Sequence, residues 1–220
     1  MEAVVFDMDG TMVDTEALYH LAWRNAAKNL GYTLNTEILY ATTGKRMDDC
    51  YAIIQDRMGD EFPMSAFKAG WWAYWQEHAE TRGIARKPGL DQLLNWLDAQ
   101  GIPKAVATSS ARAEAIYTLE RAGILDRFSI IVTGDQIVNG KPAPDIFLLA
   151  AERLGVAAHS CVAVEDSEAG VYAASSAGMT TFMVPDLIYP GPDVTTRAFR
   201  VVKSLHDVHA WIENQWQAIS

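Results

Sequence analysis

The sequence predicts an α/β protein, and two observations lead to this prediction. After Pro88, short apolar runs alternate with amphipathic stretches that have helical spacing, an order typical of crossover units on a parallel sheet. Residues 35–82, in contrast, contain helical patterns and no convincing strand pattern. We therefore expect a Rossmann-like core, in which helices flank a parallel sheet, with an inserted all-helical cap domain.

The first strand is expected at Ala3–Phe6, because this continuous apolar run suits a strand that is buried on both faces. Asp7 and Asp9 follow it directly. If the backbone stays extended, residues two apart point to the same side, so the two carboxylates would lie together and raise each other's pKa values. The pair suits a metal-assisted nucleophile, and it equally suits acids that cap the next turn.

The inserted block begins with helical spacing from Thr15 to Leu30, and Gly31 ends this pattern. Further helices are expected near residues 38–40, 47–58 and 65–80. The predicted division of the chain is a core of residues 1–14 and 87–220 and a cap of residues 15–86.

The rest of the chain supplies the other elements of the core. Strands are expected at residues 103–107, 128–132, 160–164 and 180–184. Helices are expected at residues 90–99, 114–122, 146–154, 169–177 and about 205–216. Residues 186–194 are rich in proline and glycine, so they are expected to form a loop.

Composition excludes several classes of partner. The chain has 220 residues, of which 50% are hydrophobic, and a net charge of −10, which argues against the basic footprint of a nucleic-acid-binding protein. The two cysteines, Cys50 and Cys161, are isolated and form neither a disulfide framework nor a zinc site. No apolar run approaches the ~20 residues of a membrane span. We therefore expect a cytoplasmic protein with no nucleic-acid or membrane partner.

Polar residues follow the expected strands at the points where these strands end. They are Asp7 and Asp9 after the first strand, Thr108, Ser109 and Ser110 after the second, Lys141 beyond the third, and Glu165 and Asp166 after the fourth. Ligands of open parallel sheets bind outside the carboxyl ends of the strands. These residues are therefore expected to meet at one site.

The chemistry of this set suits a phosphate group beside a magnesium ion. Asp7 and Asp166, with a main-chain carbonyl near Asp9, are the hard oxygen ligands that Mg²⁺ prefers. Thr108 and the amide of Ser109 suit a phosphate near the start of a helix, and the lysine in the proline-containing loop would add a cation. An aspartate that attacks phosphorus is a known form of nucleophilic catalysis.

On these residues, the sequence resembles the haloacid dehalogenase superfamily and, within it, the branch of the β-phosphoglucomutase-like phosphatases. Four signatures match in order: DMDGT at residues 7–11, the strand ending in Thr108, Lys141, and VEDSEAG at residues 164–170. The resemblance spans the chain, and the helical insertion has the position and size of the cap of that branch.

The resemblance implies roles for these residues. Asp7 would be the nucleophile, and Asp9 would be the general acid and then the general base. Thr108, Ser109 and Lys141 would hold the phosphate. The ligands of Mg²⁺ would be Asp7, Asp9 through its carbonyl and Asp166, with Glu165 either a further ligand or a residue that supports the ligands.

We therefore expect a Mg²⁺-dependent phosphatase of small phosphorylated metabolites, sugar phosphates above all, that is a monomer or weak dimer. A sugar-phosphate mutase is an alternative. Tyr19 and Met47 stand where the mutases have His and Arg, because His20 and Arg46 are each one position away, and this favours the phosphatase. A catalytically silent ligand-binding module is an alternative of another class.

The cap offers candidates for substrate specificity. Gly44, Lys45 and Arg46 would reach over the site, although a basic pair of this kind equally suits a solvated surface. Trp71 and Trp75 fall on one helix face, where packing of the cap is favoured over a ligand pocket.

Overall fold

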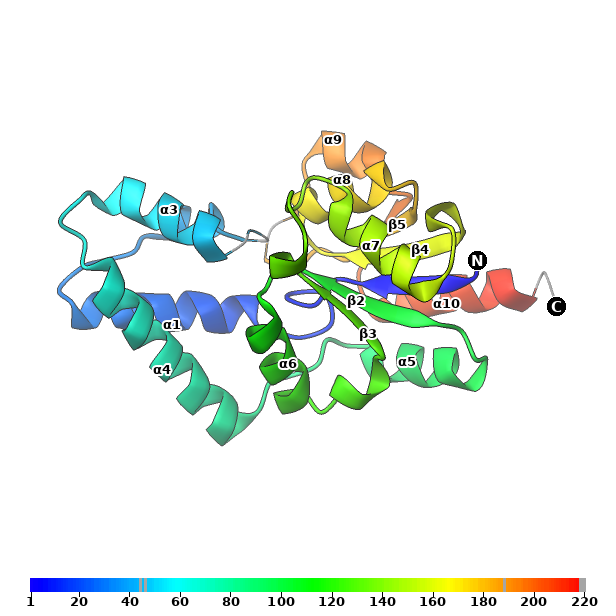
Figure 1. The fold of residues 1–220 in the computed structure, drawn as a ribbon, viewed down its shortest axis with the longest axis horizontal. Helices are drawn as coiled ribbons and strands as arrows, with labels where there is room; N and C mark the ends of the chain where they lie inside the picture. The colour runs from blue at the N-terminus through cyan, green and yellow to red at the C-terminus, as the bar shows by residue number, and fades with distance from the viewer. Residues whose placement is uncertain (44, 46, 188, 218–220) are drawn as a thin grey trace.

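The core is a six-stranded parallel sheet with the order β3-β2-β1-β4-β5-β6 (Figure 1). The computed structural model describes residues 1–43, 45, 47–187 and 189–217. The strands are β1 Ala3–Phe6, β2 Lys104–Thr108, β3 Ile130–Thr133, β4 Cys161–Glu165, β5 Thr180–Met183 and β6 Arg200–Val201. The predicted α/β class is confirmed, and the strand order is that of doubly wound nucleotide-binding folds, whose ligands lie at the carboxyl ends of the strands.

β1 lies at the centre of the sheet because its four residues are apolar and have no exposed surface. Val4 and Phe6 pack with the helices on one face, and Ala3 and Val5 pack with those on the other. The first face carries α5 Leu90–Ala99, α6 Arg112–Arg121 and α10 Leu205–Gln217, and the second carries α7 Asp145–Leu154 and α8 Glu168–Ser176. The alternation of side chains along a strand thus divides the hydrophobic core into two layers.

The segment before the last helix differs from the prediction. Residues 186–194 were expected to form a loop, but α9 begins within it and spans Pro192–Arg197. A proline fits the first turn of a helix, because its missing N–H has no partner there. Val194 packs on Val171 and Met183. The edge strand β6 and the 3₁₀ turns at Leu125–Arg127, Gly134–Gln136 and Ala158–Ser160 were also not predicted.

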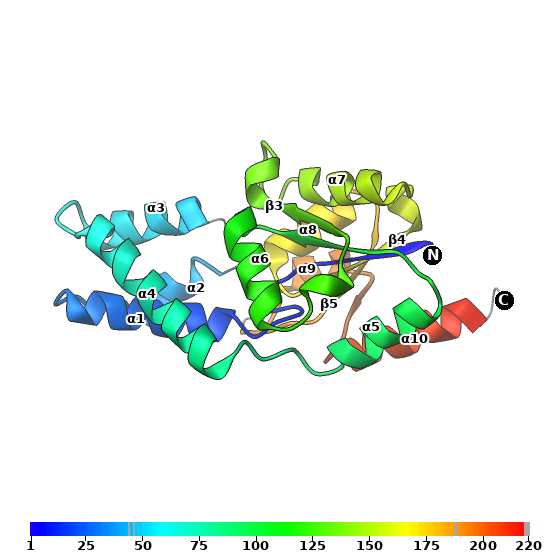
Figure 2. The same cartoon turned by 60° about the horizontal axis from the view of Figure 1, so that its bottom comes forward.

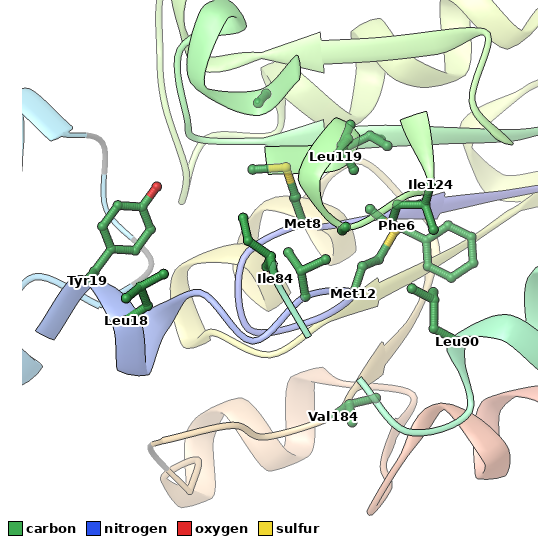
Figure 3. Packing of buried hydrophobic residues seen from close by; sticks show 14 of the residues in the cluster. Phe6, Met8, Met12, Leu18, Tyr19, Ile84, Leu90, Leu119, Ile124 and Val184 are labelled. Carbon is green, nitrogen blue, oxygen red and sulfur yellow. The ribbon is translucent and has the colours of Figure 1, made fainter. Parts of the chain in front are cut away.

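The insertion after β1 forms an all-helical cap beyond the carboxyl ends of the strands (Figures 1 and 2). Its helices are α1 Glu16–Asn29, α2 Thr36–Tyr40, α3 Met47–Met58 and α4 Met64–Arg82. No helix in the described part of the chain has the length and apolar character to cross a bilayer. The core cluster continues from Phe6 through Met8, Met12 and Ile84 towards the cap (Figure 3).

Aromatic side chains hold the cap together. Trp71 and Trp75 are buried, and the indole N–H of Trp71 donates to the hydroxyl of Tyr51 at 3.1 Å. Tyr19 stacks on Trp75 with ring centroids 5.8 Å apart, and its ring also contacts Trp23. The expectation that the two tryptophans pack the cap is confirmed.

The two connections between cap and core run side by side. The amide of Asp14 donates to Ala85 at 2.9 Å, and the amide of Lys87 donates to Met12 at 2.8 Å. The ammonium of Lys87 also pairs with Asp14 at 3.3 Å and with Asp186 at 2.6 Å. These contacts tie both connections to the loop that follows β5.

Two side chains join α1 of the cap directly to α6 of the core. The hydroxyl of Tyr19 donates to Oε1 of Glu114 at 2.6 Å, and both residues are buried. Nearby, the rings of Trp72 and Trp75 lie 6.2 and 5.6 Å from that of Tyr117 on α6. Burial raises the pKa of Glu114 to about 7, although its hydrogen bond with Tyr19 opposes the shift.

Replacing Gly89 by alanine is expected to destabilise the core. Gly89 has φ +92°, and an added Cβ would lie 2.5 Å from the backbone nitrogen of His206, where α10 begins. The left-handed backbone costs about 1–2 kcal/mol, and overpacking adds about 1–3 kcal/mol. Gly101→Ala is the control, because Gly101 has φ +66° with open space around it. Urea unfolding should show the larger loss for Gly89→Ala, and equal losses would contradict this packing argument.

The stability of the protein is expected to depend on pH through Glu114. Its pKa is about 7 in the folded protein and near 4.5 in the unfolded chain, so its contribution to the free energy of unfolding is full below pH 4.5 and is lost as pH rises through 7. The loss should reach about 3 kcal/mol, since one pKa unit corresponds to about 1.4 kcal/mol.

Glu114→Gln removes this titration and leaves the other buried acids in place. Urea unfolding between about pH 4.5 and pH 8 should therefore show that the wild type loses more stability than the variant as pH rises. Parallel pH dependences of the two proteins would show that the carboxyl of Glu114 titrates as it does in water.

Candidate active site

One pocket at the carboxyl edge of the sheet collects most of the predicted site residues. Its lining includes Asp7, Asp9, Thr108, Ser109, Lys141 and Asp166 from the core and Lys45 from the cap. Glu165 lies directly behind it and has no exposed surface. Residues from four separate segments of the core therefore meet in one place. Gly44 and Arg46, the other two predicted specificity residues, lie outside the described residues.

Asp7 reaches the pocket because β1 ends at Phe6, and its amide extends the sheet by donating to Val164 at 2.9 Å. The next side chain, Met8, points the other way into the hydrophobic core (Figure 3). Asp9 then returns to the pocket. The predicted arrangement of two carboxylates on one side of the chain is thus present.

Lys141 lies between two carboxylates. Its ammonium is 2.5 Å from Oδ1 of Asp7 and 2.5 Å from Oε1 of Glu165, and it also donates to the carbonyl of Ala107 at 3.2 Å. The side chain of Lys141 is only 2% exposed. Burial alone lowers the pKa of Lys141, but the two carboxylates more than reverse this effect. The lysine is therefore a fixed cation beside Asp7.

The second oxygen of Glu165 fixes the start of α8. Oε2 accepts hydrogen bonds from the amides of Asp166 and Ser167 and from the hydroxyl of Ser167, each at 3.0 Å. Ser167 in turn caps α8 by accepting from the amide of Gly170. A Cβ on Gly170 would fall 1.7 Å from Glu165, so the glycine provides the room for the carboxylate. These contacts aim Asp166 into the pocket.

Asp7, Glu165 and Asp166 form a buried cluster whose carboxylate oxygens lie within 4.8 Å of one another. Burial raises the pKa of Asp7 well above its usual range, and Lys141 only partly opposes the shift. Burial and the charges of Glu165 and Asp7 raise the pKa of Asp166 in the same way. Three acids with one buried lysine leave excess negative charge, and a cation with oxygen ligands relieves it. The donor set therefore fits Mg²⁺.

The carboxylate of Asp9 is held by three hydroxyl groups instead of by the lysine. Oδ1 accepts from Thr15 at 2.6 Å, and Oδ2 accepts from Ser110 at 2.9 Å and from Thr108 at 3.3 Å. Burial raises the pKa of Asp9, and these hydrogen bonds oppose the shift. The two carboxylates of the DMDGT motif therefore have different surroundings, one beside a cation and one among neutral donors.

Part of the pocket lining was missed by the sequence analysis. Tyr19, Trp23, Met47 and Cys50 line it from the cap, and Glu114 lines it from α6. Tyr19 and Trp23 are one helical turn apart, so spacing could have grouped them. Nothing in the local sequence marks Glu114, because its partner is 95 residues away.

His20 takes no part in the pocket. It is buried, its ring lies 5.9 Å from that of Tyr40, and burial lowers its pKa. Thr15, whose hydroxyl contacts Asp9, was missed because it was read only as the start of a helix.

Known proteins resemble this chain over most of its length. Residues 4–184 match the family described as haloacid dehalogenase-like hydrolase. The chain is 33% identical over 218 residues to a phosphorylated carbohydrates phosphatase of Thermotoga maritima. That match covers 97% of this chain and 91% of the Thermotoga protein. It is 33% identical over 177 residues to the fructose-1-phosphate phosphatase YqaB of Escherichia coli. That match covers 80% of this chain and 92% of the Escherichia coli protein.

A solved structure supports the same relationship. The β-phosphoglucomutase of Clostridium difficile superposes with a TM-score of 0.80 at 26% identity, over 100% of this chain and 98% of that one. The family match covers β1 through β5 and so includes every strand end that contributes to the pocket. The chain therefore belongs to the haloacid dehalogenase-like hydrolase family.

Proposed function

We propose that this protein is a Mg²⁺-dependent phosphatase of small phosphorylated metabolites, sugar phosphates above all. The observation that carries the proposal is the position of Asp7. This carboxylate ends the central strand, contacts the Lys141 ammonium, and belongs to a buried cluster of three acids. The relatives named as phosphatases of phosphorylated carbohydrates and of fructose 1-phosphate support the substrate class.

In the proposed reaction, the carboxylate of Asp7 attacks phosphorus while the ester P–O bond breaks. Asp9 donates its proton to the leaving oxygen, and its raised pKa favours the protonated form that this step needs. Water then attacks the aspartyl phosphate, Asp9 accepts a proton from it, and the bond to Asp7 breaks to release phosphate. Atoms and charges balance, and Asp9 ends the cycle protonated again.

The other core residues would bind the phosphoryl group and a metal. Lys141 would neutralise phosphoryl oxygens, with Thr108 and the amide of Ser109 as further donors. Asp7 and Asp166, with Glu165 and the carbonyl of Asp9, would hold Mg²⁺. When bound, the metal would supply charge neutralisation for the anionic phosphoryl group.

The pocket is small. Its cavity volume is about 40 Å³, and one water needs roughly 10–15 Å³. We infer that the cap moves away from the core to admit an ester and closes over it, with Lys45 at the pocket rim contributing to specificity. Closure would exclude water during phosphoryl transfer.

A mutase remains the second candidate, because a β-phosphoglucomutase shares the fold across the whole chain. Phosphorus NMR of β-glucose 1-phosphate with a trace of the bisphosphate distinguishes the two: glucose 6-phosphate forms with a mutase, and inorganic phosphate forms with a phosphatase. We further infer a cytoplasmic monomer or weak dimer. Both cysteines are free and buried, which agrees with a reducing compartment.

Asp7→Asn is expected to abolish phosphate release. With Mg²⁺ and a panel of sugar, polyol and nucleotide monophosphates, kcat/KM should fall at least about 1,000-fold, as for the loss of a catalytic nucleophile, and chelation with EDTA should stop the wild type. Asp126→Asn is the matched control, because Asp126 is exposed and outside the pocket. Release that survives Asp7→Asn would exclude the proposed nucleophile, and no release from any ester would leave the mutase and the silent binding module as the two candidates.

Asp9→Asn is expected to slow turnover by about 100–10,000-fold, the usual contribution of a general acid or base. With p-nitrophenyl phosphate, whose leaving group needs no proton, transfer of the phosphoryl group to Asp7 should be slowed less than hydrolysis of the aspartyl phosphate. Stopped-flow absorbance should then show a burst of one nitrophenolate per active site followed by slow turnover. Slow release without a burst would contradict the assignment of both roles to Asp9.

A further inference from the structure

The contact between Tyr19 and Glu114 has no role in the phosphoryl chemistry described above, although both residues line the pocket. The tyrosine hydroxyl donates to Oε1 of Glu114 at 2.6 Å. The tyrosine and the glutamate are 7% and 9% exposed. A buried carboxylate in a ligand pocket costs free energy unless its hydrogen-bonding capacity is used. This cost points to a function for Glu114 that packing alone does not supply.

The core alone sets the position of Glu114 relative to the phosphate-binding residues. α6 begins at Arg112, directly after Thr108, Ser109 and Ser110, and Glu114 lies in its first turn. Movement of the cap therefore leaves the distance between this carboxylate and the predicted phosphate site unchanged. A leaving group that extends from the phosphate towards α6 would meet Glu114 in every enzyme–substrate complex.

The cap, in contrast, determines how Glu114 is oriented. Tyr19 is stacked on Trp75 at 5.8 Å and meets the edge of Trp71 at 5.9 Å, so its hydroxyl has little freedom. Tyr19 can hold Glu114 only when the cap lies against the core. Orientation of the carboxylate is thereby linked to closure over the substrate.

Glu114 retains capacity for a ligand. A carboxylate can accept about four hydrogen bonds, and the partners of this one are the hydroxyl of Tyr19 and the backbone of Ala111. Trp23, Met47 and Cys50 line the same pocket from the cap. Above about pH 7 the carboxyl of Glu114 is ionised and only accepts hydrogen bonds. Apolar side chains and such an acceptor in one pocket are together complementary to a carbon skeleton that carries hydroxyl groups.

The charges of the pocket favour a leaving group without further negative charge. Among the described lining residues there are two cations, Lys45 and Lys141, and five carboxylates. Lys141 is already engaged by Asp7 and Glu165. A second anionic group near Glu114 would be repelled by its carboxylate above about pH 7, where this carboxyl is ionised.

We propose that Glu114 is a specificity-determining residue that accepts a hydrogen bond from a hydroxyl of the leaving group, and that Tyr19 is the positioning residue that orients it. The site would then select monophosphate esters of uncharged, polyhydroxylated compounds. This inference rests on the proposed phosphatase function and assigns its substrate class to one pair of side chains.

The test compares a hexitol monophosphate with hexyl phosphate, which has a carbon chain of the same length and no hydroxyl groups. The wild type should prefer the hexitol ester by about 10–100-fold in kcat/KM, as expected for a hydrogen bond to a charged group. Glu114→Gln should raise KM for the hexitol ester about 10-fold with little change in kcat, because this interaction is made equally in ground and transition states. The value of kcat/KM for hexyl phosphate should be unchanged, which would show that the variant is correctly folded.

Two further variants sharpen the test. Tyr19→Phe removes only the hydroxyl. It should raise KM for the hexitol ester and leave kcat/KM for hexyl phosphate unchanged. Glu120→Gln is the matched control, because Glu120 is an exposed glutamate on the same helix as Glu114, and it should leave kcat/KM unchanged for both esters.

The outcomes separate the two proposals. Suppose that both esters are hydrolysed in an Asp7-dependent way and that Glu114→Gln changes kcat/KM for both esters equally or for neither. The assignment of Glu114 is then wrong, and the phosphatase function stands. Faster hydrolysis of a hexitol bisphosphate than of the monophosphate would also overturn the assignment of Glu114. If the wild type hydrolyses no ester, the phosphatase function and this inference fail together.

Discussion

The site depends on one buried cation. Lys141 contacts Asp7, directly after the central strand, and Glu165, at the end of the neighbouring strand. A buried charge is tolerated only when it is paired and hydrogen-bonded. Because the other oxygen of Glu165 is used by the first amides of the next helix, the position of this ammonium also determines where Asp166 lies. The sheet, the helix start and the acidic cluster are thus parts of one electrostatic arrangement.

The two aspartates of the DMDGT motif show how environment separates two similar groups. Asp7 lies beside a cation, while Asp9 receives hydrogen bonds from neutral hydroxyl groups of both cap and core. The proposed nucleophile needs the ionised form, which the ammonium of Lys141 favours against the effect of burial, and the proposed general acid needs the protonated form, which burial favours. The two carboxylates lie within one three-residue stretch because alternate residues there return to the same pocket.

Much of the core and of its site could be predicted from the sequence, because the signals are local. Residues 90–99 were expected as a helix and form α5 with the same bounds, since an amphipathic pattern ended by glycine determines both ends. β6 has only two residues, too few for any pattern. Thr15 and Glu114 were missed because their importance arises from partners placed by the packing of cap on core, which no single sequence window contains.

The paired connections between cap and core have a wider consequence. Since Asp14 bonds to Ala85 and Lys87 bonds to Met12, the two ends of the insertion are neighbours, and the chain enters and leaves the cap at a single point. A segment attached in this way can be exchanged for another, or for a short turn, without stretching the backbone on either side. The architecture is modular: the helical insertion can be replaced by another one while the strands of the core and the residues at their carboxyl ends keep their positions.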